Sequence, residues 1–314
     1  MFVARFILAR QYRETNRSCR LPLYHFLSVD IELIVRFRQR NVVNYQYRSN
    51  GPDVWVNLPP DEDDLSRVTS LQLYLENEKH CKHAALLLDL VKSLVRLEIQ
   101  ILDDSVKLLD TLLLLTRFRP HKPKSLQLDR FDFSDGVHSL EQLVEIKKLE
   151  ELQLTNCANY RRLLRELKNL PLGLKTFRIH EYGMGERDFG IDSNNFIRSL
   201  DSLERVSLTL DSDFEFLDPS TLLDWSSLRA CASMLKYLRL EYYSIKSPFS
   251  CQTTALDFSV FCKLAINLEQ LSISGIDIGE DMMVMMGDTS EGATEDTSEC
   301  PGFQGISHFL VSHV

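Results

Sequence analysis

Two histidines and a cysteine lie close together in the segment EKHCKH, as His80, Cys81 and His83. Imidazole nitrogens and a thiolate are common zinc ligands, but a closed zinc site needs four of them. The sequence has no second cluster at ligand spacing. We therefore expect these three residues to lead into a helix and to hold no metal.

Two further segments contain residue types that bind ligands in other proteins. DSDFEF (211–216) places acids at alternate positions, as a calcium-binding loop does, but Phe216 stands where that loop needs glycine and Leu222 where it needs glutamate. GMGERDFG (183–190) is glycine-rich without the GxGxxG spacing of a dinucleotide-binding turn. No phosphate-binding loop, GxSxG or HExxH motif occurs. We expect no catalytic residues, no cofactor and no enzyme activity.

The charge of the chain narrows the kinds of partner. The 314 residues carry a net charge of −9, although residues 1–50 contain nine Arg, no Lys and three acids. The acidic remainder lacks the basic face that nucleic-acid binding requires. No apolar run reaches the roughly 18 residues that indicate a membrane-spanning helix. We expect neither nucleic acid nor a membrane as a partner.

Cysteine usage bears on location. Seven Cys at irregular spacing, with no CxxC pair, do not predict a disulfide framework. This usage indicates a reducing compartment, so we expect a cytoplasmic or nuclear protein. The Arg-rich N-terminus, MFVARFILARQYRETNRSCR, keeps a mitochondrial location open as an alternative, because transit peptides have this composition.

A pattern of apolar residues, LxxLxL, recurs along the chain and must position any functional surface. Its central apolar residue falls at positions 71, 97, 126, 152, 177, 206, 238 and 271, so the copies lie 25 to 33 residues apart. The copies are VTSLQL (68–73), LVRLEI (94–99), PKSLQL (123–128), LEELQL (149–154), LKTFRI (174–179), LERVSL (203–208), LKYLRL (235–240) and LEQLSI (268–273). Alternation of apolar and polar residues within each copy predicts a strand.

Between the copies, apolar residues three and four apart predict helices. These segments are 83–94, 104–118, 159–170, 193–200 and 219–232. Ser193 and Ser220 stand just ahead of apolar runs, where helix N-caps are expected. A single strand–helix unit cannot bury its apolar face, so the units must stack. The prediction is an α/β solenoid of about eight irregular repeats, with a curved parallel sheet inside and helices outside.

These copies resemble leucine-rich repeats. TNC after LEELQL, ending at Cys157, fits the LxxLxLxxC form and is similar to the cysteine-containing and ribonuclease-inhibitor-like subclasses. The resemblance covers residues 65–278, and its uneven spacing looks like the divergent arrays that follow fungal F-box domains. The residues that resemble the frame of an F-box are Leu21, Pro22, Trp55 and Leu58.

The chain divides into four expected parts. The proline and acid run NLPPDEDDLS marks a boundary, so residues 1–59 are expected to form a basic N-terminal cap or a degenerate F-box-like region. Residues 60–278 are expected to form the repeat array. Residues 279–302, in which Ser, Thr, Gly and acids dominate, predict a disordered acidic segment. Residues 303–314 read as a truncated further repeat.

The resemblance implies a non-catalytic protein-interaction module. In F-box proteins with such repeats, the F-box binds the adaptor of a cullin-type ubiquitin ligase and the repeats hold the substrate. One expectation is therefore a ubiquitin ligase substrate receptor that contacts the adaptor through its N-terminal region. The alternative is a structural or assembly scaffold without a ligase role, mitochondrial if the N-terminus is a transit peptide.

The polar residues between the apolar strand positions are expected to face the concave surface of the solenoid. The fifth, sixth and seventh copies bring together Arg178, His180, Arg205, Tyr237 and Arg239. Arg and Tyr dominate binding hot spots, and a guanidinium binds carboxylate or phosphate through two hydrogen bonds. We predict that this patch binds an acidic or phosphorylated segment of a protein partner. The alternative is a solvated surface on which neighbouring charges pair with one another.

Overall fold

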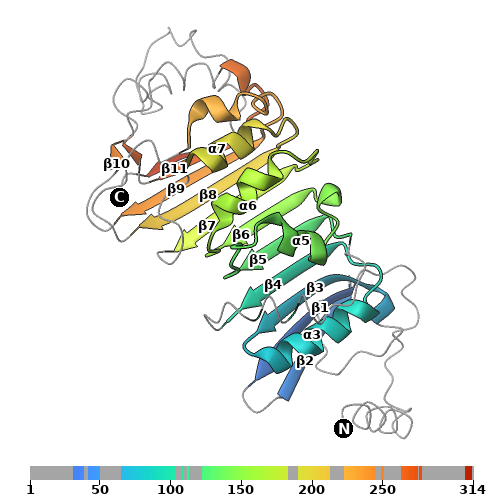
Figure 1. Ribbon diagram of the computed structural model, residues 1–314. Coiled ribbons are helices and arrows are strands. Elements are labelled where there is room, and N and C mark those ends of the chain that lie inside the picture. Colours follow the sequence, from blue (N-terminus) through green and yellow to red (C-terminus); the bar gives the residue numbers. More distant parts are fainter. Residues whose placement is uncertain are drawn as a thin grey trace, which may run out of the picture.

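A single open sheet with helices on one face dominates the structure, which is an α/β fold (Figure 1). The computed structural model describes residues 31–38, 42–49, 65–102, 108, 112, 122–182, 190–212, 223–244, 249–250, 263–274, 276–277 and 308–312. Within these ranges, every helix falls short of the length and apolar character needed to cross a membrane.

The main sheet has eleven strands, in the order β13-β11-β9-β8-β7-β6-β5-β4-β3-β1-β2. Their bounds are β1 (Ile31–Arg38), β2 (Val42–Ser49), β3 (Val68–Leu75), β4 (Arg96–Ile101), β5 (Ser125–Asp129), β6 (Glu151–Thr155), β7 (Thr176–Tyr182), β8 (Arg205–Ser212), β9 (Tyr237–Ser244), β11 (Gln270–Ser274) and β13 (His308–Ser312). Neighbouring strands are parallel throughout, except that β2 pairs antiparallel with β1 at one edge. Two short strands, β10 (Phe249–Ser250) and β12 (Ile276–Asp277), form a separate parallel pair.

All eight predicted strands are confirmed, and they stack without a register shift. The central apolar residues of the eight copies are direct cross-strand partners from β3 to β11. The partners run Leu71, Leu97, Leu126, Leu152, Phe177, Val206, Leu238, Leu271. A slip of one residue would turn every apolar side chain of a strand to the opposite face, so burial of this row fixes the register.

The sheet extends beyond the eight copies at both edges. At one edge β1 continues it, with Leu33 beside Leu71. At the other edge β13 pairs with β11 and places Phe309 beside Leu271. The predicted acidic segment 279–302 and the F-box-like residues Leu21, Pro22, Trp55 and Leu58 lie outside the described residues.

Helices cover one face of the sheet as a single layer (Figure 1). They are α3 (Glu78–Leu90), α5 (Val137–Leu143), α6 (Tyr160–Leu167) and α7 (Gly190–Arg198), together with the 3₁₀ turns η3 (Ile146–Lys148) and η5 (Trp225–Leu228). The helices predicted near 159–170 and 193–200 are confirmed as α6 and α7, whereas α5 was not predicted. Of the predicted helix 104–118, only Leu108 and Leu112 are described, and both are helical and buried.

Two helix starts differ from the sequence prediction. Helix α3 begins five residues before the predicted position, because the Asn77 side chain accepts hydrogen bonds from the backbone N–H of Lys79 and His80. The N-cap prediction for Ser193 is wrong: α7 begins at Gly190, and Ser193 lies buried inside it. Ser220 lies outside the described residues.

The core lies between the sheet and the helix layer. On β4, β5 and β6, strand positions alternate between buried apolar residues and more exposed polar ones, whereas on β8 the polar Ser207 and Thr209 are buried as well. The central row of the eight copies is at most 1% exposed. Burying a Leu-sized side chain contributes about 1.5–3 kcal/mol, so each strand supplies two or three such contributions on its helix side. The opposite face of the sheet carries the polar residues and is free of helices in the described ranges (Figure 1).

Candidate functional site

The candidate site is the open face of the sheet, opposite the helices. We define this face by the polar positions of β3 to β11, three on each strand. They are Ser70, Gln72, Tyr74; Arg96, Glu98, Gln100; Ser125, Gln127, Asp129; Glu151, Gln153, Thr155; Thr176, Arg178, His180; Arg205, Ser207, Thr209; Tyr237, Arg239, Glu241; and Gln270, Ser272, Ser274. Because the strands are in register, these positions form three straight rows across the sheet, which we call the rows at the strand starts, in the middle and at the strand ends. The longer strands β7, β8 and β9 continue beyond the third row.

All five predicted site residues lie on this face, on three adjacent strands. Arg178 on β7 and Arg239 on β9 are both partners of Ser207 on the intervening strand β8. Arg205 and Tyr237 are direct partners in the row at the strand starts. His180 lies in the row at the strand ends. We call these five residues the Arg patch.

The two arginines that flank Ser207 differ in how firmly they are held. The Arg178 guanidinium lies 3.5 Å from a carboxylate oxygen of Glu151 and 3.5 Å from the amide oxygen of Gln153, both of which are long contacts. Arg239 is bound much more closely: its Nη2 lies 2.6 Å from Oε1 of Glu241. Of the two guanidiniums, that of Arg178 is therefore the less committed to neighbours.

Glu241 is the buried anchor of the patch. It is 8% exposed, and its second carboxylate oxygen accepts a hydrogen bond from the Thr209 hydroxyl at 3.2 Å. A carboxylate that is removed from water needs such partners, and Arg239 and Thr209 supply them. The side chain of Arg239 is still 43% exposed, which leaves part of its guanidinium facing solvent.

The patch retains positive charge after this pairing. Burial lowers the pKa of His180, and the charges of Arg178 and Arg239 lower it further, so at neutral pH the imidazole is uncharged. Arg205 is exposed and makes no ion pair among the residues that the structure describes. Two carboxylates thus offset two of three guanidiniums. The alternative prediction, local pairing of charges, holds for Arg239 and only loosely for Arg178.

The other half of the open face, on β3 to β6, has a different character. Its middle row consists of Gln72, Glu98, Gln127 and Gln153. At the strand ends, Asp129 on β5 is the direct partner of Thr155 on β6. Oδ1 of Asp129 and Oγ1 of Thr155 are buried, and neither has a hydrogen-bond partner within the described part of the chain. Burial also raises the pKa of the Asp129 carboxyl, although Arg130 and two amide neighbours oppose the shift.

Sequence reasoning missed a second charged row, which we call the start ladder. It occupies the residue just before each strand on six successive copies, where Lys and Glu alternate: Lys124, Glu150, Lys175, Glu204, Lys236, Glu269. Glu150 bridges its two neighbours, at 2.8 Å from Lys124 and 2.9 Å from Lys175, and these bonds lower its pKa to about 2. The second position of each LxxLxL copy carries the signal, which appears only when the copies are aligned.

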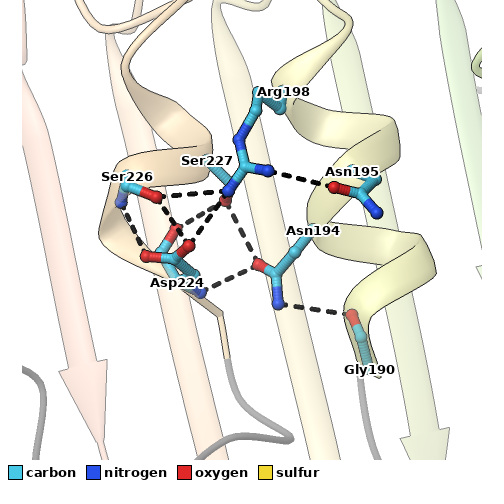
Figure 2. A network of polar contacts seen from close by, with 7 residues as sticks. All are labelled: Gly190, Asn194, Asn195, Arg198, Asp224, Ser226 and Ser227. Atoms are coloured by element: carbon cyan, nitrogen blue, oxygen red, sulfur yellow. Dashed lines mark hydrogen bonds and ion pairs between the residues drawn. The ribbon is translucent and has the colours of Figure 1, made fainter.

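A buried polar network ties two neighbouring units together on the helix side (Figure 2). The side-chain oxygen of Asn194 on α7 accepts hydrogen bonds from the backbone N–H of Asp224 at 2.8 Å and from the Ser227 hydroxyl at 3.2 Å. Its amide nitrogen donates to the Gly190 carbonyl at 3.2 Å. Arg198 closes the network from outside, 3.1 Å from the Asp224 carboxylate. These contacts satisfy buried groups within the scaffold.

The other chemical candidates from the sequence are placed as follows. His80 and Cys81 are buried in α3, where the Cys81 thiol donates to the Leu108 carbonyl at 3.3 Å. Nδ1 of His80 accepts the backbone N–H of Glu76 at 3.1 Å. Among the described residues, no group of three His, Cys, Asp or Glu side chains has the arrangement of a metal site. Segments 213–216 and 183–189 lie outside the described ranges.

No protein-family model matches the chain, and no curated protein matches it in sequence. The function must therefore be argued from the open face and its chemistry.

Proposed function

We propose that this chain is a non-catalytic protein-interaction module of the leucine-rich-repeat type, whose Arg patch binds an acidic or phosphorylated segment of a protein partner. The observation that carries the proposal is the register of β7, β8 and β9. It places three guanidiniums and a phenol on one helix-free face, with Ser207 between two of them. Repeat arrays use such extended sheet faces for binding.

The leucine-rich-repeat assignment rests on the stacking of the eight copies. Each copy contributes a parallel strand, and the central apolar residues align across all eight strands. Cys157, the residue that fits the repeat consensus, is fully buried, and its thiol donates to the Leu128 carbonyl of the preceding unit at 3.5 Å. A buried cysteine that bonds a neighbouring unit fits the role that the consensus position would have.

The geometry of the Arg patch suits an anion. The Cα atoms of Arg178 and Arg239 are two strands apart, which is about 9.6 Å. A carboxylate or phosphate above Ser207 could accept hydrogen bonds from both guanidiniums. Tyr237 adds a phenol beside the charged groups, and aromatic and guanidinium side chains together are typical of binding hot spots.

Within this class, the N-terminal strands favour the scaffold alternative over a ubiquitin ligase substrate receptor. β1 and β2 take up residues 31–38 and 42–49 as a continuation of the sheet. An array needs a cover for its terminal unit, and a pair of strands at the edge of the sheet supplies one. Co-purification of the full chain with a ligase adaptor and a cullin would instead support the receptor.

A peptide-selection experiment tests the proposal. The full chain is exposed to a display library and to a phosphopeptide array, beside the charge-reversal variant Arg178→Glu/Arg239→Glu. A matched control, Lys92→Glu/Arg229→Glu, makes the same change in net charge at two exposed positions away from the open face. We expect the wild type and the control to enrich acidic or phosphorylated sequences and the patch variant to lose them. Enrichment that is not acidic, or that survives in the patch variant, would overturn the proposal.

A further inference from the structure

The open face has two halves of different character, one on β7 to β9 and one on β3 to β6. The half on β3 to β6 contains buried oxygen atoms that lack hydrogen-bond partners within the part of the chain that the structure describes. The Arg patch on β7 to β9 attracts anions. On β5 and β6, the buried oxygen atoms Asp129 Oδ1 and Thr155 Oγ1 have no hydrogen-bond partner among the described residues. Gln100 and Asn156 already form side-chain hydrogen bonds with the Asp129 carboxyl. A carboxylate oxygen accepts hydrogen bonds only, so Oδ1 is the atom that still lacks a donor in the described ranges.

Arg130 already acts on the Asp129 carboxyl from the next position of the chain, but the open-face positions around Asp129 carry a negative balance and favour a cation as that donor. Glu98 on β4 and Glu151 on β6 are the other two carboxylates of this half, and Arg96 is its only guanidinium on the open-face positions of β3 to β6. Glu151 also faces Arg178 across the boundary between the halves. The charge on the open face therefore changes sign between β6 and β7.

We propose that the partner segment crosses the strands in an extended conformation and is dipolar: a Lys or Arg side chain binds at Asp129 and Thr155, and an Asp, Glu or phosphorylated side chain binds at the Arg patch. This inference rests on the proposed function, because it describes the rest of the segment whose acidic part occupies that patch. The argument for this occupant is charge complementarity along one line of the sheet.

The spacing of the two charges follows from the sheet. Asp129 and Arg178 are two strands and one row apart, which is about 12 Å, and Asp129 and Arg239 are about 20 Å apart. An extended chain advances about 3.3 Å per residue. The basic and acidic residues of the partner should therefore be four to six positions apart. Between them, the Gln127 and Gln153 amides lie on the path and can bond the backbone of the segment.

Synthetic peptides of ten residues test this directly against the full chain. Each contains one phosphoserine, with a lysine five positions away, one position away, or replaced by glutamine, and the lysine is placed on either side in separate peptides. Affinity is measured by fluorescence anisotropy and calorimetry. We expect the five-position peptide to bind about tenfold more tightly than the glutamine peptide, which corresponds to about 1.4 kcal/mol. The one-position peptide should gain nothing, because its lysine cannot reach Asp129.

Two variants separate this inference from the proposed function. Asp129→Asn removes the charge with little change of shape, and it should abolish the tenfold preference while leaving the affinity for the glutamine peptide unchanged. Asp201→Asn, at an exposed position outside the open face, is its control. Unchanged urea midpoints verify that both variants fold.

The outcomes are distinct. If the phosphopeptides bind and depend on Arg178 and Arg239, but lysine position and Asp129→Asn have no effect, the dipolar partner is refuted and the proposed function stands. If no phosphopeptide binds, or if binding ignores both arginines, the proposed function fails first. A preference for lysine that persists in Asp129→Asn also overturns the inference, because the cation would then bind elsewhere.

Discussion

Asn194 is expected to be one of the most important polar side chains for the stability of this fold. It is 5% exposed, and its amide forms hydrogen bonds with Gly190, Asp224 and Ser227, the last two of which lie in the next unit (Figure 2). The change to test is Asn194→Ala. It removes these three bonds at about 1 kcal/mol each. Ser227 keeps a second acceptor, the Asp224 carbonyl at 2.5 Å, whereas the Asp224 N–H loses its acceptor.

The expected loss is about 3 kcal/mol in the free energy of unfolding. Urea denaturation followed by circular dichroism measures it as a lower midpoint. The neighbouring Asn195→Ala is the matched control, because its side chain is half-buried and accepts one bond, from Arg198 at 3.0 Å. That variant should lose no more than about 1 kcal/mol.

A result in which the two alanine variants unfold at the same urea concentration would refute this reasoning. A double variant gives a second check. Ser227→Ala alone removes a bond to Asn194, so Asn194→Ala/Ser227→Ala should cost less than the sum of the two single changes. Strict additivity would mean that the network does not couple the two units.

Three further predictions concern other parts of the scaffold. Gly136→Ala should destabilise the fold by about 1–2 kcal/mol in urea denaturation, because Gly136 has φ +65° and a Cβ there would overlap the Glu166 carboxylate. Gly173 has open space around it, so Gly173→Ala should leave the stability unchanged. Burial and the nearby His80 lower the pKa of His83 to about 4, so the unfolded state binds the proton first as the pH falls. The free energy of unfolding should therefore fall by about 3 kcal/mol between pH 6.5 and 4 because of His83. His83→Gln should remove that part of the acid sensitivity in pH-dependent denaturation. An unchanged pH profile in this variant would refute the prediction. Burial raises the pKa of the Cys157 thiol, which is fully buried. We therefore expect this thiol to resist iodoacetamide at pH 8 until urea unfolds the chain, which mass spectrometry of the labelled peptide would show. Rapid labelling of Cys157 in the native protein would contradict its buried position.

The strands could be predicted from the sequence because their signal is local and repeated. Each LxxLxL copy alternates apolar and polar residues, and eight copies reinforce one another, so even PKSLQL, with Pro123 in place of its first apolar residue, forms β5. The helix starts were harder. At α7 the buried apolar residues Phe196 and Ile197 lie in the second turn, and Ile191 in the first turn is exposed, so Ser193 looked like a cap although the helix already begins at Gly190.

The residues of the open face could also be predicted, because every second residue of a strand points to the same side of the sheet. The ion pairs between their side chains could not. Arg239 binds Glu241 on its own strand rather than an acid of a neighbouring strand. Whether a long side chain bonds along a strand or across to the next depends on rotamers that the sequence does not specify. The sequence also places Asp129 and Thr155 on the open face. It does not show that one oxygen atom of each side chain lacks a hydrogen-bond partner among the residues that the structure describes, because this too depends on side-chain rotamers.

The start ladder has a consequence for how such an array can change length. Within the row from Lys124 to Glu269, Lys175 and Lys236 each stand between two Glu, and Glu150 and Glu204 each stand between two Lys. Excising the single unit that carries Lys175 would bring Glu150 beside Glu204. The two carboxylates would then repel each other at the starts of neighbouring strands. Excising two consecutive units would restore an attractive Lys–Glu contact. Gains and losses in this part of the chain are therefore favoured in pairs, so two consecutive strand-and-connection segments are the natural step for an engineered extension.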